Sequence, residues 1–305
     1  MSIFETLRDK YELMLNKSDK RFDHWLWMKS PVPTLVFLFL YIVTIYIGPK
    51  IMRNREPFHL KPVLVLYNLC LVVLSAYISI ETVRIAVFKY EYNWFCQPID
   101  YSTEDDVMRL SSMGWWFYIS KIIELLDTVF FILRKKNNQI SVLHCYHHGT
   151  MTIICWTGVK YFGGGSSFIY PMFNSTIHTF MYTYYGLAAM GPSMQKYLWW
   201  KKYMTKLQLL QLVGIMFFMG GGIFKDCNFP KIVNKAVIVY TLSLVVLFGN
   251  FYYRAYIAKK QVSKSKSNGL KSHQNGVAIS NGIYAHNGSS SSRSSKQQNG
   301  KSKIN

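Results

Sequence analysis

The chain has 305 residues, half of them hydrophobic, and its 35 Lys and Arg outnumber its 15 Asp and Glu to give a formal net charge of +20. Apolar runs of about 20 residues, the length that crosses a bilayer core, dominate residues 1–257. This composition excludes a soluble globular protein. It also argues against nucleic acid as a partner, because the cations here lie in short loops beside the apolar runs, where lipid head groups or a phosphorylated ligand are available.

We expect three regions along the chain. Residues 1–31 form an N-terminal segment that is charged and amphipathic and lacks the short apolar core of a signal peptide. Residues 32–257 form a membrane domain. Residues 258–305 are rich in Lys, Ser, Asn and Gly and contain no acidic residue, so we expect a disordered basic tail.

Seven apolar segments follow one another in the membrane domain. They predict an all-α integral membrane protein with seven transmembrane helices. Polar groups interrupt the third to the sixth segment, whereas the other three are uniformly apolar. The segments are residues 32–48, 62–80, 113–133, 140–159, 168–190, 207–224 and 232–253.

Lys and Arg accumulate on one side of these spans, in the loops KIMRNREPFHLK, RKKNN and QKYLWWKKYMTK and in the tail. The other side carries the N-terminus, the acidic IDYSTEDD segment and a loop with Lys160. By the positive-inside rule the basic side is cytosolic, so we expect a lumenal N-terminus and a cytosolic C-terminus.

Three short features fit a multi-pass protein of the endoplasmic reticulum membrane in this orientation. Asn16, in NKS, is a lumenal candidate for glycosylation. Cys96 and Cys227 lie in lumenal loops, where an oxidising compartment would allow a disulfide between them. Lys301 and Lys303, in the final KSKIN, resemble a cytosolic dilysine retrieval signal.

The third span contains KIIELLDT, in which Lys121, Glu124, Asp127 and Thr128 share a broad helix face. Ions within a membrane are costly and usually functional. A self-neutralising cluster that only joins helices is the structural alternative. Three ions within eight residues exceed what helix association requires, so we expect a site.

The next three spans add polar stripes of their own. In HCYHH of the fourth span, helical spacing places three imidazoles on one side, while Cys145 and Tyr146 point elsewhere. NSTIHTFMYTYY of the fifth span and TKLQLLQ of the sixth repeat polar groups in the same way. The stripes consist of His144, His147 and His148, then Asn174, His178 and Tyr182, then Gln208 and Gln211.

Depth along the helices places these groups together. At about 1.5 Å per residue, Glu124 and Asp127 of the third span and the histidines of the fourth lie roughly 9 to 15 Å from the cytosolic ends of their helices. We therefore predict one buried polar chamber in the cytosolic half of the membrane. Its mouth would be lined by the basic residues Arg134, Lys135, Lys201 and Lys202.

Two kinds of enzyme use histidine-rich membrane helices in this way. A di-iron desaturase needs about eight histidines in several boxes, but only four of the eight here lie in the spans. A single metal on His144, His148 and a carboxylate remains an alternative. In the other kind, a neutral imidazole acts as nucleophile or base on a thioester, with basic residues holding the phosphates of coenzyme A. A seven-helix receptor or transporter explains the span count but not the histidine stripe.

The four motifs KIIELLDT, HCYHH, NSTIHTFMYTYY and TKLQLLQ, in this order on successive spans, resemble the signature motifs of the very-long-chain fatty acid elongase family. The resemblance covers residues 30–257, and RKKNNQISVLHCYHH is similar to the branch that extends saturated and very long chains. Many members carry Val or Trp at the position of Cys145, which by helical phase faces away from the chamber.

The resemblance implies a 3-oxoacyl-CoA synthase of the endoplasmic reticulum that condenses malonyl-CoA with a long-chain acyl-CoA and releases CO2 and CoA. It implies six helices in an inverted barrel around an acyl tunnel, a disulfide between Cys96 and Cys227, and no bound cofactor or metal. The expected partners are both CoA substrates, membrane lipids and the reductase and dehydratase of the elongation cycle, with a homo-oligomer left open and no nucleic acid.

The resemblance also implies roles for individual residues. His147 would carry the acyl group as an acyl-imidazole, His144 and His148 would orient it or move protons, and His178 would assist the malonyl half-reaction. Asp127 would join them in catalysis. The substrate-binding residues would be Lys121 for the malonyl carboxylate, Asn174 and Gln208 as hydrogen-bond donors, and Glu124, Tyr182, Gln211, Arg134, Lys135, Lys201 and Lys202.

Overall fold

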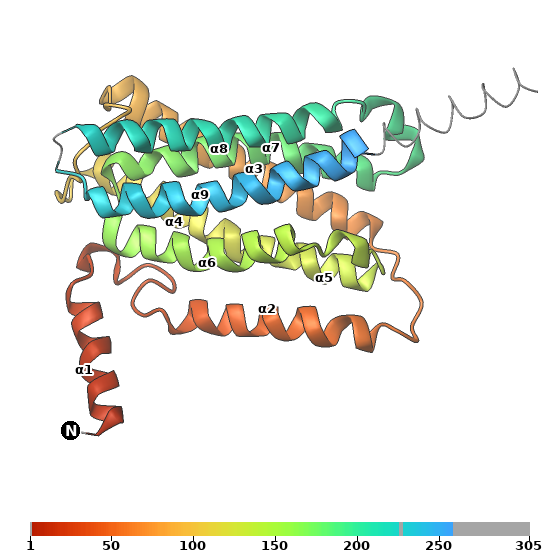
Figure 1. Ribbon diagram of the computed structural model, residues 1–305, viewed down its shortest axis with the longest axis horizontal. Coiled ribbons are helices and arrows are strands. Elements are labelled where there is room, and N and C mark those ends of the chain that lie inside the picture. Colours follow the sequence, from red (N-terminus) through yellow and green to blue (C-terminus); the bar gives the residue numbers. More distant parts are fainter. Residues whose placement is uncertain (1, 226–227, 259–305) are drawn as a thin grey trace, which may run out of the picture. The chain divides into compact units, whose positions relative to one another are not determined.

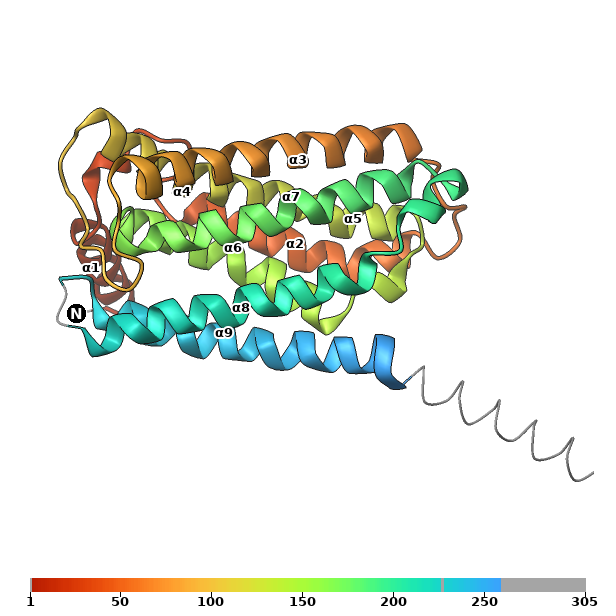
Figure 2. The ribbon, with the colours of Figure 1, turned by 90° about the horizontal axis from the view of Figure 1, so that it is seen from above.

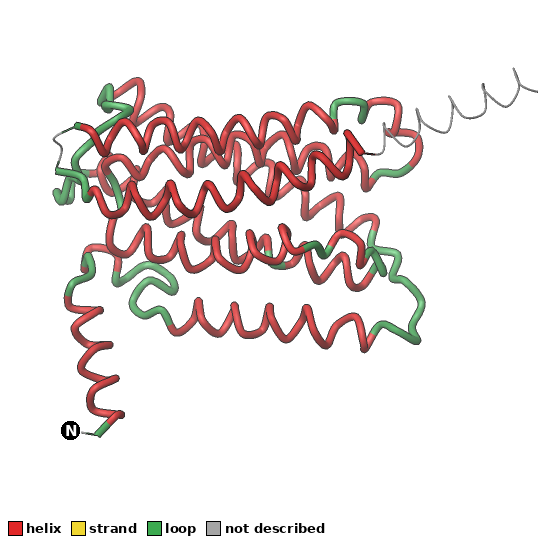
Figure 3. Tube along the Cα trace, viewed as in Figure 1, coloured by secondary structure: helices red, strands yellow, loops and turns green. Residues whose placement is uncertain are grey.

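The computed structural model describes residues 2–225 and 228–258, and within them the regular structure is helical, without a strand (Figure 3). The chain divides into two units, Met1–Tyr252 and Tyr253–Asn305. In the second unit the described part is the π-helix η6, Tyr253–Ala258. The predicted tail, with Lys301 and Lys303, otherwise lies outside the described residues, and the three predicted regions stay predictions.

Each predicted span coincides with a helix or a pair of helices in the first unit (Figure 1). The spans correspond in chain order to α2 Val32–Ile51, α3 Lys61–Val83, the pair α4 Asp105–Glu124 and α5 Leu126–Leu133, α6 Val142–Phe162, α7 Ile169–Ala189, α8 Lys201–Phe224 and α9 Lys231–Tyr252. A further helix, α1 Ile3–Asn16, precedes them. The all-α prediction is confirmed.

Four of these helices are long and apolar enough to cross a membrane by length and composition. They are α2, α3 with its π-helical extension η2 Arg84–Lys89, α8, and α9 with its continuation to Ala258. The helices between α3 and α8 contain three of the four polar motifs, which lower their hydropathy. Four of the seven predicted spans are therefore supported as membrane-crossing helices, and the other three stay predictions.

Short 3-10 helices occupy most of the remaining connections. They are η1 Lys20–Phe22, η3 Asn137–Gln139, η4 Gly165–Phe168 and η5 Pro192–Tyr197. The connection between α6 and α7 also contains Gly165 with φ +53°, where a Cβ atom would lie 2.7 Å from the carbonyl oxygen of Gln97. That position therefore requires glycine.

The third predicted span was wrong in two details. Its helix begins at Asp105 rather than residue 113, since Asp105 and Asp106 in the first turn suit the positive end of the helix dipole. The helix is also interrupted at Leu125, where the amides of Leu125 and Thr128 bond to carbonyls three residues earlier. This tightened turn separates α4 from α5.

Most neighbouring helices after α1 in the first unit pack in antiparallel fashion, as Figures 1 and 2 show. α3 lies along α7, α8 along α9 and α4 along α6, whereas α2 contacts α5 and α6 at the edge. Many large apolar side chains point outward, among them Phe39, Leu66 and Val246. An apolar exterior is what a lipid-facing bundle requires.

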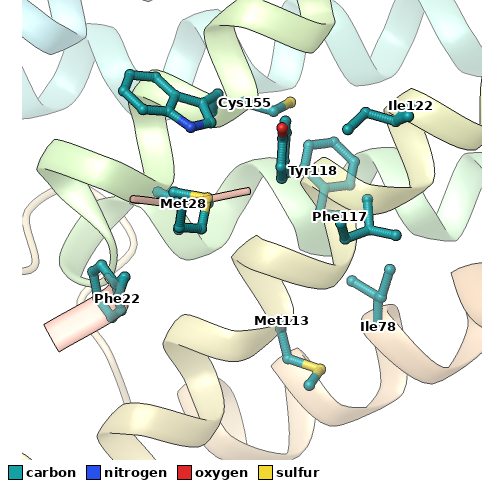
Figure 4. Close-up of a cluster of buried hydrophobic side chains, with 11 residues drawn as sticks. Phe22, Met28, Ile78, Met113, Phe117, Tyr118, Ile122 and Cys155 are labelled. Atoms are coloured by element: carbon teal, nitrogen blue, oxygen red, sulfur yellow. The ribbon is translucent and has the colours of Figure 1, made fainter. Parts of the chain in front are cut away.

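A cluster of buried apolar side chains fills the bundle at the end where α2 begins. Phe117 and Tyr118 of α4 and Cys155 of α6 meet Phe22 and Met28 from the segment after α1 (Figure 4). Lys160 was expected in a loop but lies in α6, fully buried, paired with Asp23 and donating to the backbone oxygen of Asp19. A buried ammonium needs such partners, so this segment closes one end of the bundle.

Candidate active site

A polar cluster formed by Lys121, Glu124, Asn174 and His178 joins α4 to α7. The Lys121 Nζ atom lies 2.8 Å from Glu124 Oε1 and 2.9 Å from Asn174 Oδ1. His178 Nδ1 lies 3.2 Å from the same Glu124 oxygen and 3.4 Å from Lys121 Nζ. Helical spacing brings Lys121 to Glu124, and Asn174 to His178, so two adjacent turns on each helix build the cluster.

Glu124 is the centre of this cluster. Its Oε1 accepts from Lys121 and from the Ser120 hydroxyl, which lies 3.3 Å away. Its side chain is fully buried, and among the described residues its Oε2 has no hydrogen-bond partner. A buried carboxylate oxygen without a partner is costly, so this position calls for an explanation.

Asp127 lies beyond the interruption at Leu125 and contacts a different residue. The Tyr182 hydroxyl of α7 donates to Asp127 Oδ2 at 3.0 Å. Tyr182 is fully buried, and its ring packs 5.6 Å from the His178 ring, centroid to centroid. The two acids of KIIELLDT therefore contact two neighbouring side chains of α7: Glu124 contacts His178, and Asp127 contacts Tyr182.

The three histidines of α6 form one contiguous stripe. The ring centroids of His144 and His148 are 4.4 Å apart, and those of His147 and His148 are 5.3 Å apart. Ser141 caps the helix by accepting from the His144 amide at 3.2 Å, so His144 lies in the first turn of α6. The Tyr146 hydroxyl instead contacts Ser243 of α9 at 2.8 Å, so Tyr146 points away from the stripe.

The three rings are held differently. His144 Nε2 lies 2.7 Å from Thr128 Oγ1 of α5. His148 is buried, whereas His147 is half-buried. Within the part of the chain that the structure describes, no hydrogen bond is made by the His147 ring, although the ring interacts electrostatically with Lys121, Glu124 and His178. Its nitrogens are available to a reacting group.

The remaining predicted residues lie outside these contacts. Gln208 of α8 contacts the sulfur of Met181 at 3.5 Å, one turn after His178, and Gln211 is half-buried. Arg134 is half-buried, while Lys135, Lys201 and Lys202 are exposed near the ends of α5 and α8. Their roles as hydrogen-bond donors or phosphate ligands stay predictions.

Two tyrosines outside the motifs complete the site. Tyr41 of α2 accepts from Thr128 Oγ1 at 3.3 Å, and Tyr67 of α3 donates to the backbone oxygen of Ile123 at 3.3 Å. Tyr67 also interacts electrostatically with Asp127. Each is a single phenol in an otherwise apolar span, so the sequence gives little sign of its role. Only its depth along the helix, which is similar to that of the acids on α4 and α5, could have indicated a polar neighbour.

Cys96 is disulfide-bonded, while Cys227 lies outside the described residues. Cys70, Cys145 and Cys155 are free thiols. Among the residues that the structure describes, no group of three or more His, Cys, Asp or Glu side chains could hold a metal ion.

Comparison with known proteins identifies the family. The model of the ELO: GNS1/SUR4 family matches residues 26–264. The chain is 44% identical over 289 residues to very long chain fatty acid elongase 4 of Macaca mulatta and of Homo sapiens, covering 94% of this chain and 89% of each relative. It is 43% identical over 270 residues to very long chain fatty acid elongase 7 of Drosophila melanogaster, covering 87% and 80%. The chain therefore belongs to the ELO: GNS1/SUR4 family of fatty acid elongases and is an acyltransferase.

Proposed function

We propose that this enzyme condenses malonyl-CoA with a long-chain acyl-CoA to a 3-oxoacyl-CoA two carbons longer, releasing CO2 and CoA, without a bound cofactor. The observation that carries this proposal is the contrast among the imidazoles. His144 is held by Thr128 and His178 by Glu124, whereas the described part of the chain offers the rings of His147 and His148 no hydrogen bond. Of these two rings, His148 is buried and His147 is the more accessible. An unrestrained imidazole beside oriented polar groups suits nucleophilic catalysis.

In the first half-reaction a ring nitrogen of His147 attacks the thioester carbonyl of the acyl-CoA. A carbon–nitrogen bond forms, the carbon–sulfur bond breaks, and CoA leaves as a thiolate that takes up the proton lost from the imidazole. His148, whose ring contacts that of His147, is placed to relay this proton.

In the second half-reaction the malonyl carboxylate leaves as CO2, and the electron pair of the broken bond forms an enolate. The enolate carbon attacks the acyl carbonyl, and the bond to His147 breaks. The departing ring nitrogen takes up one proton from water, which regenerates the neutral imidazole. Lys121 is suited to hold the malonyl carboxylate, and His178 and Asn174 are suited to orient the thioester, because both contact Lys121. Gln208, Gln211 and the basic residues near the helix ends would bind the CoA moiety.

The proposal includes a membrane architecture. Seven spans would cross the endoplasmic reticulum membrane with a lumenal N-terminus, and six of them would surround an acyl tunnel as an inverted barrel. The position of α2 at the edge of the first unit supports this, since α2 contacts only α5 and α6 extensively among the described elements. Glycosylation at Asn16 would report the lumenal side, and the reductase and dehydratase of the cycle are the expected partners.

The direct test supplies purified protein with labelled malonyl-CoA and a series of acyl-CoA chains from palmitoyl upward. We expect 3-oxoacyl-CoA two carbons longer than the substrate. Incubation with acyl-CoA alone should leave an acyl adduct on the peptide that contains His147, detected by mass spectrometry. Absence of product across the series, with iron bound to the protein, would instead favour a metal-dependent lipid oxidase.

The nucleophile is tested by substitution. His147→Ala should abolish both the adduct and condensation, whereas His59→Ala, at an exposed position between α2 and α3, is the matched control and should retain both. An adduct that survives His147→Ala but disappears in His178→Ala would show that the assignment is wrong.

A further inference from the structure

α1 presents an apolar stripe although it precedes the membrane domain. Along this 14-residue helix the apolar positions follow one another at intervals of one, three or four residues, which places them on one side. The three acids and Leu13 occupy the opposite side, while Arg8 and Lys10 flank the stripe. The stripe consists of Ile3, Phe4, Leu7, Tyr11, Met14 and Leu15.

No residue of α1 is buried against the rest of the chain. Ile3, Phe4 and Leu7 are 82%, 77% and 61% exposed. Ser2 and Glu5 nevertheless form a capping box that fixes the start of the helix. A well-capped helix with an exposed apolar stripe requires a partner for that stripe.

The direction of α1 indicates which surface it follows. Figure 1 shows α1 running crosswise to the spanning helices, and Figure 2 shows it nearly end-on, in agreement. The Tyr11 hydroxyl lies 2.9 Å from Ser30 Oγ, directly before α2, and the Tyr161 hydroxyl of α6 donates to the Met14 carbonyl at 3.0 Å. Because Tyr11 belongs to the stripe, these bonds turn the stripe toward the start of α2.

The start of α2 lies at the edge of the lipid-facing surface. Val32 and Leu35, in its first turn, are both about half exposed. Trp25, Trp115 and Trp116 form an aromatic group at this end, with ring centroids 5.9 and 4.7 Å apart between neighbours. Tryptophan at the end of membrane helices is typical of the interface between head groups and acyl chains.

We propose that α1 is an interfacial helix that lies in the surface of the bilayer and binds zwitterionic phospholipid through its apolar stripe. Outside the stripe it carries three acids and two bases, so it has no cationic excess for anionic lipid. A second copy of the chain fits less well, because a face about 21 Å long and 10 Å wide offers about 200 Å2, against about 800 Å2 per partner in a stable complex.

The test places the photoreactive residue benzoylphenylalanine at Leu7 or at Glu12 of the full chain in phosphatidylcholine bilayers. The expected result is a lipid adduct at Leu7 in several-fold excess over Glu12. Phe4 is a second position on the stripe, and both stripe positions are exposed, so neither probe disturbs packing. The same probe at Phe39, an exposed position on α2, serves as the positive control for lipid contact.

Equal lipid yields at Leu7 and Glu12 would overturn the proposal. It would also be overturned if both stripe positions gave no lipid adduct while Phe39 gave one. Crosslinks from Leu7 to a second copy would identify a protein interface instead. None of these outcomes depends on condensation activity, so the proposed function is tested separately.

Discussion

The Thr128 hydroxyl of α5 lies 2.7 Å from His144 Nε2 of α6. The same hydroxyl lies 3.3 Å from the Tyr41 hydroxyl of α2. This chain of three side chains from α2, α5 and α6 holds the His144 ring through its Nε2 atom. Thr128 is therefore a positioning residue for the histidine stripe.

Replacing Thr128 should lower activity without unfolding the protein. Thr128→Val keeps the shape of the side chain but removes the hydroxyl that contacts His144. Loss of a hydrogen bond that contributes about 1 kcal/mol to orienting the ring corresponds to about a fivefold lower rate. Steady-state condensation measurements should show the decrease in kcat with little change in KM. Thr128→Ser should restore most of the rate. Equal rates for Thr128→Val and the unaltered enzyme would show that Thr128 does not position His144.

Substitutions in the buried pair of Lys121 and Glu124 should change stability and activity independently. Lys121→Met leaves the Glu124 charge buried without its main partner and should cost about 3 to 5 kcal/mol of folding free energy. Adding Glu124→Gln removes that charge and should recover much of the loss, measured as the thermal midpoint in detergent. Neither variant should condense malonyl-CoA. A double variant as unstable as Lys121→Met would contradict this account.

The contact between Tyr182 and Asp127 predicts a smaller effect. Tyr182→Phe removes the hydroxyl that donates to Asp127 Oδ2, and hydrogen bonds to charged groups contribute about 1.5 to 3 kcal/mol. We expect the thermal midpoint to fall accordingly. Tyr46→Phe, at a position that is 69% exposed on α2, is the control and should leave the midpoint unchanged.

Two glycines provide a matched pair for the end of the bundle opposite the basic loops. Gly165→Ala introduces a Cβ atom 2.7 Å from the Gln97 carbonyl oxygen at a positive φ, so it should destabilise the protein by at least about 1 kcal/mol. Gly158→Ala in α6 meets no atom within 4 Å and should be neutral or stabilising. Equal midpoints for the two variants would show that the α6–α7 connection adapts freely.

The sequence predicted the helices well because apolar runs of bilayer length have few alternative structures. Helical phase also placed Lys121 beside Glu124, Asn174 beside His178 and the three histidines on one stripe, since these relations depend only on spacing within one helix. Hydropathy alone recognises four of the spans, because the polar motifs KIIELLDT, HCYHH and NSTIHTFMYTYY lower the hydropathy of the other three.

Contacts between distant helices could not be predicted in the same way. Tyr41 and Tyr67 contribute to the site from spans whose sequences are otherwise apolar, and their partners follow from packing rather than period. Lys160 was misplaced because its anchoring by Asp23 depends on a segment 137 residues earlier in the chain. The tether between Tyr11 and Ser30 likewise joins residues that no local pattern relates.

The tightened turn at Leu125 sets the relative rotation of the two halves of the third span. In an uninterrupted helix each residue advances the side-chain direction by about 100°. Deleting one residue here would leave Lys121 and Glu124 facing α7 but turn Thr128 away from His144 and Asp127 away from Tyr182. The junction thus fixes the rotation of α5 relative to α4. The number of residues between Glu124 and Asp127 therefore determines whether both groups of side chains reach their partners on α6 and α7.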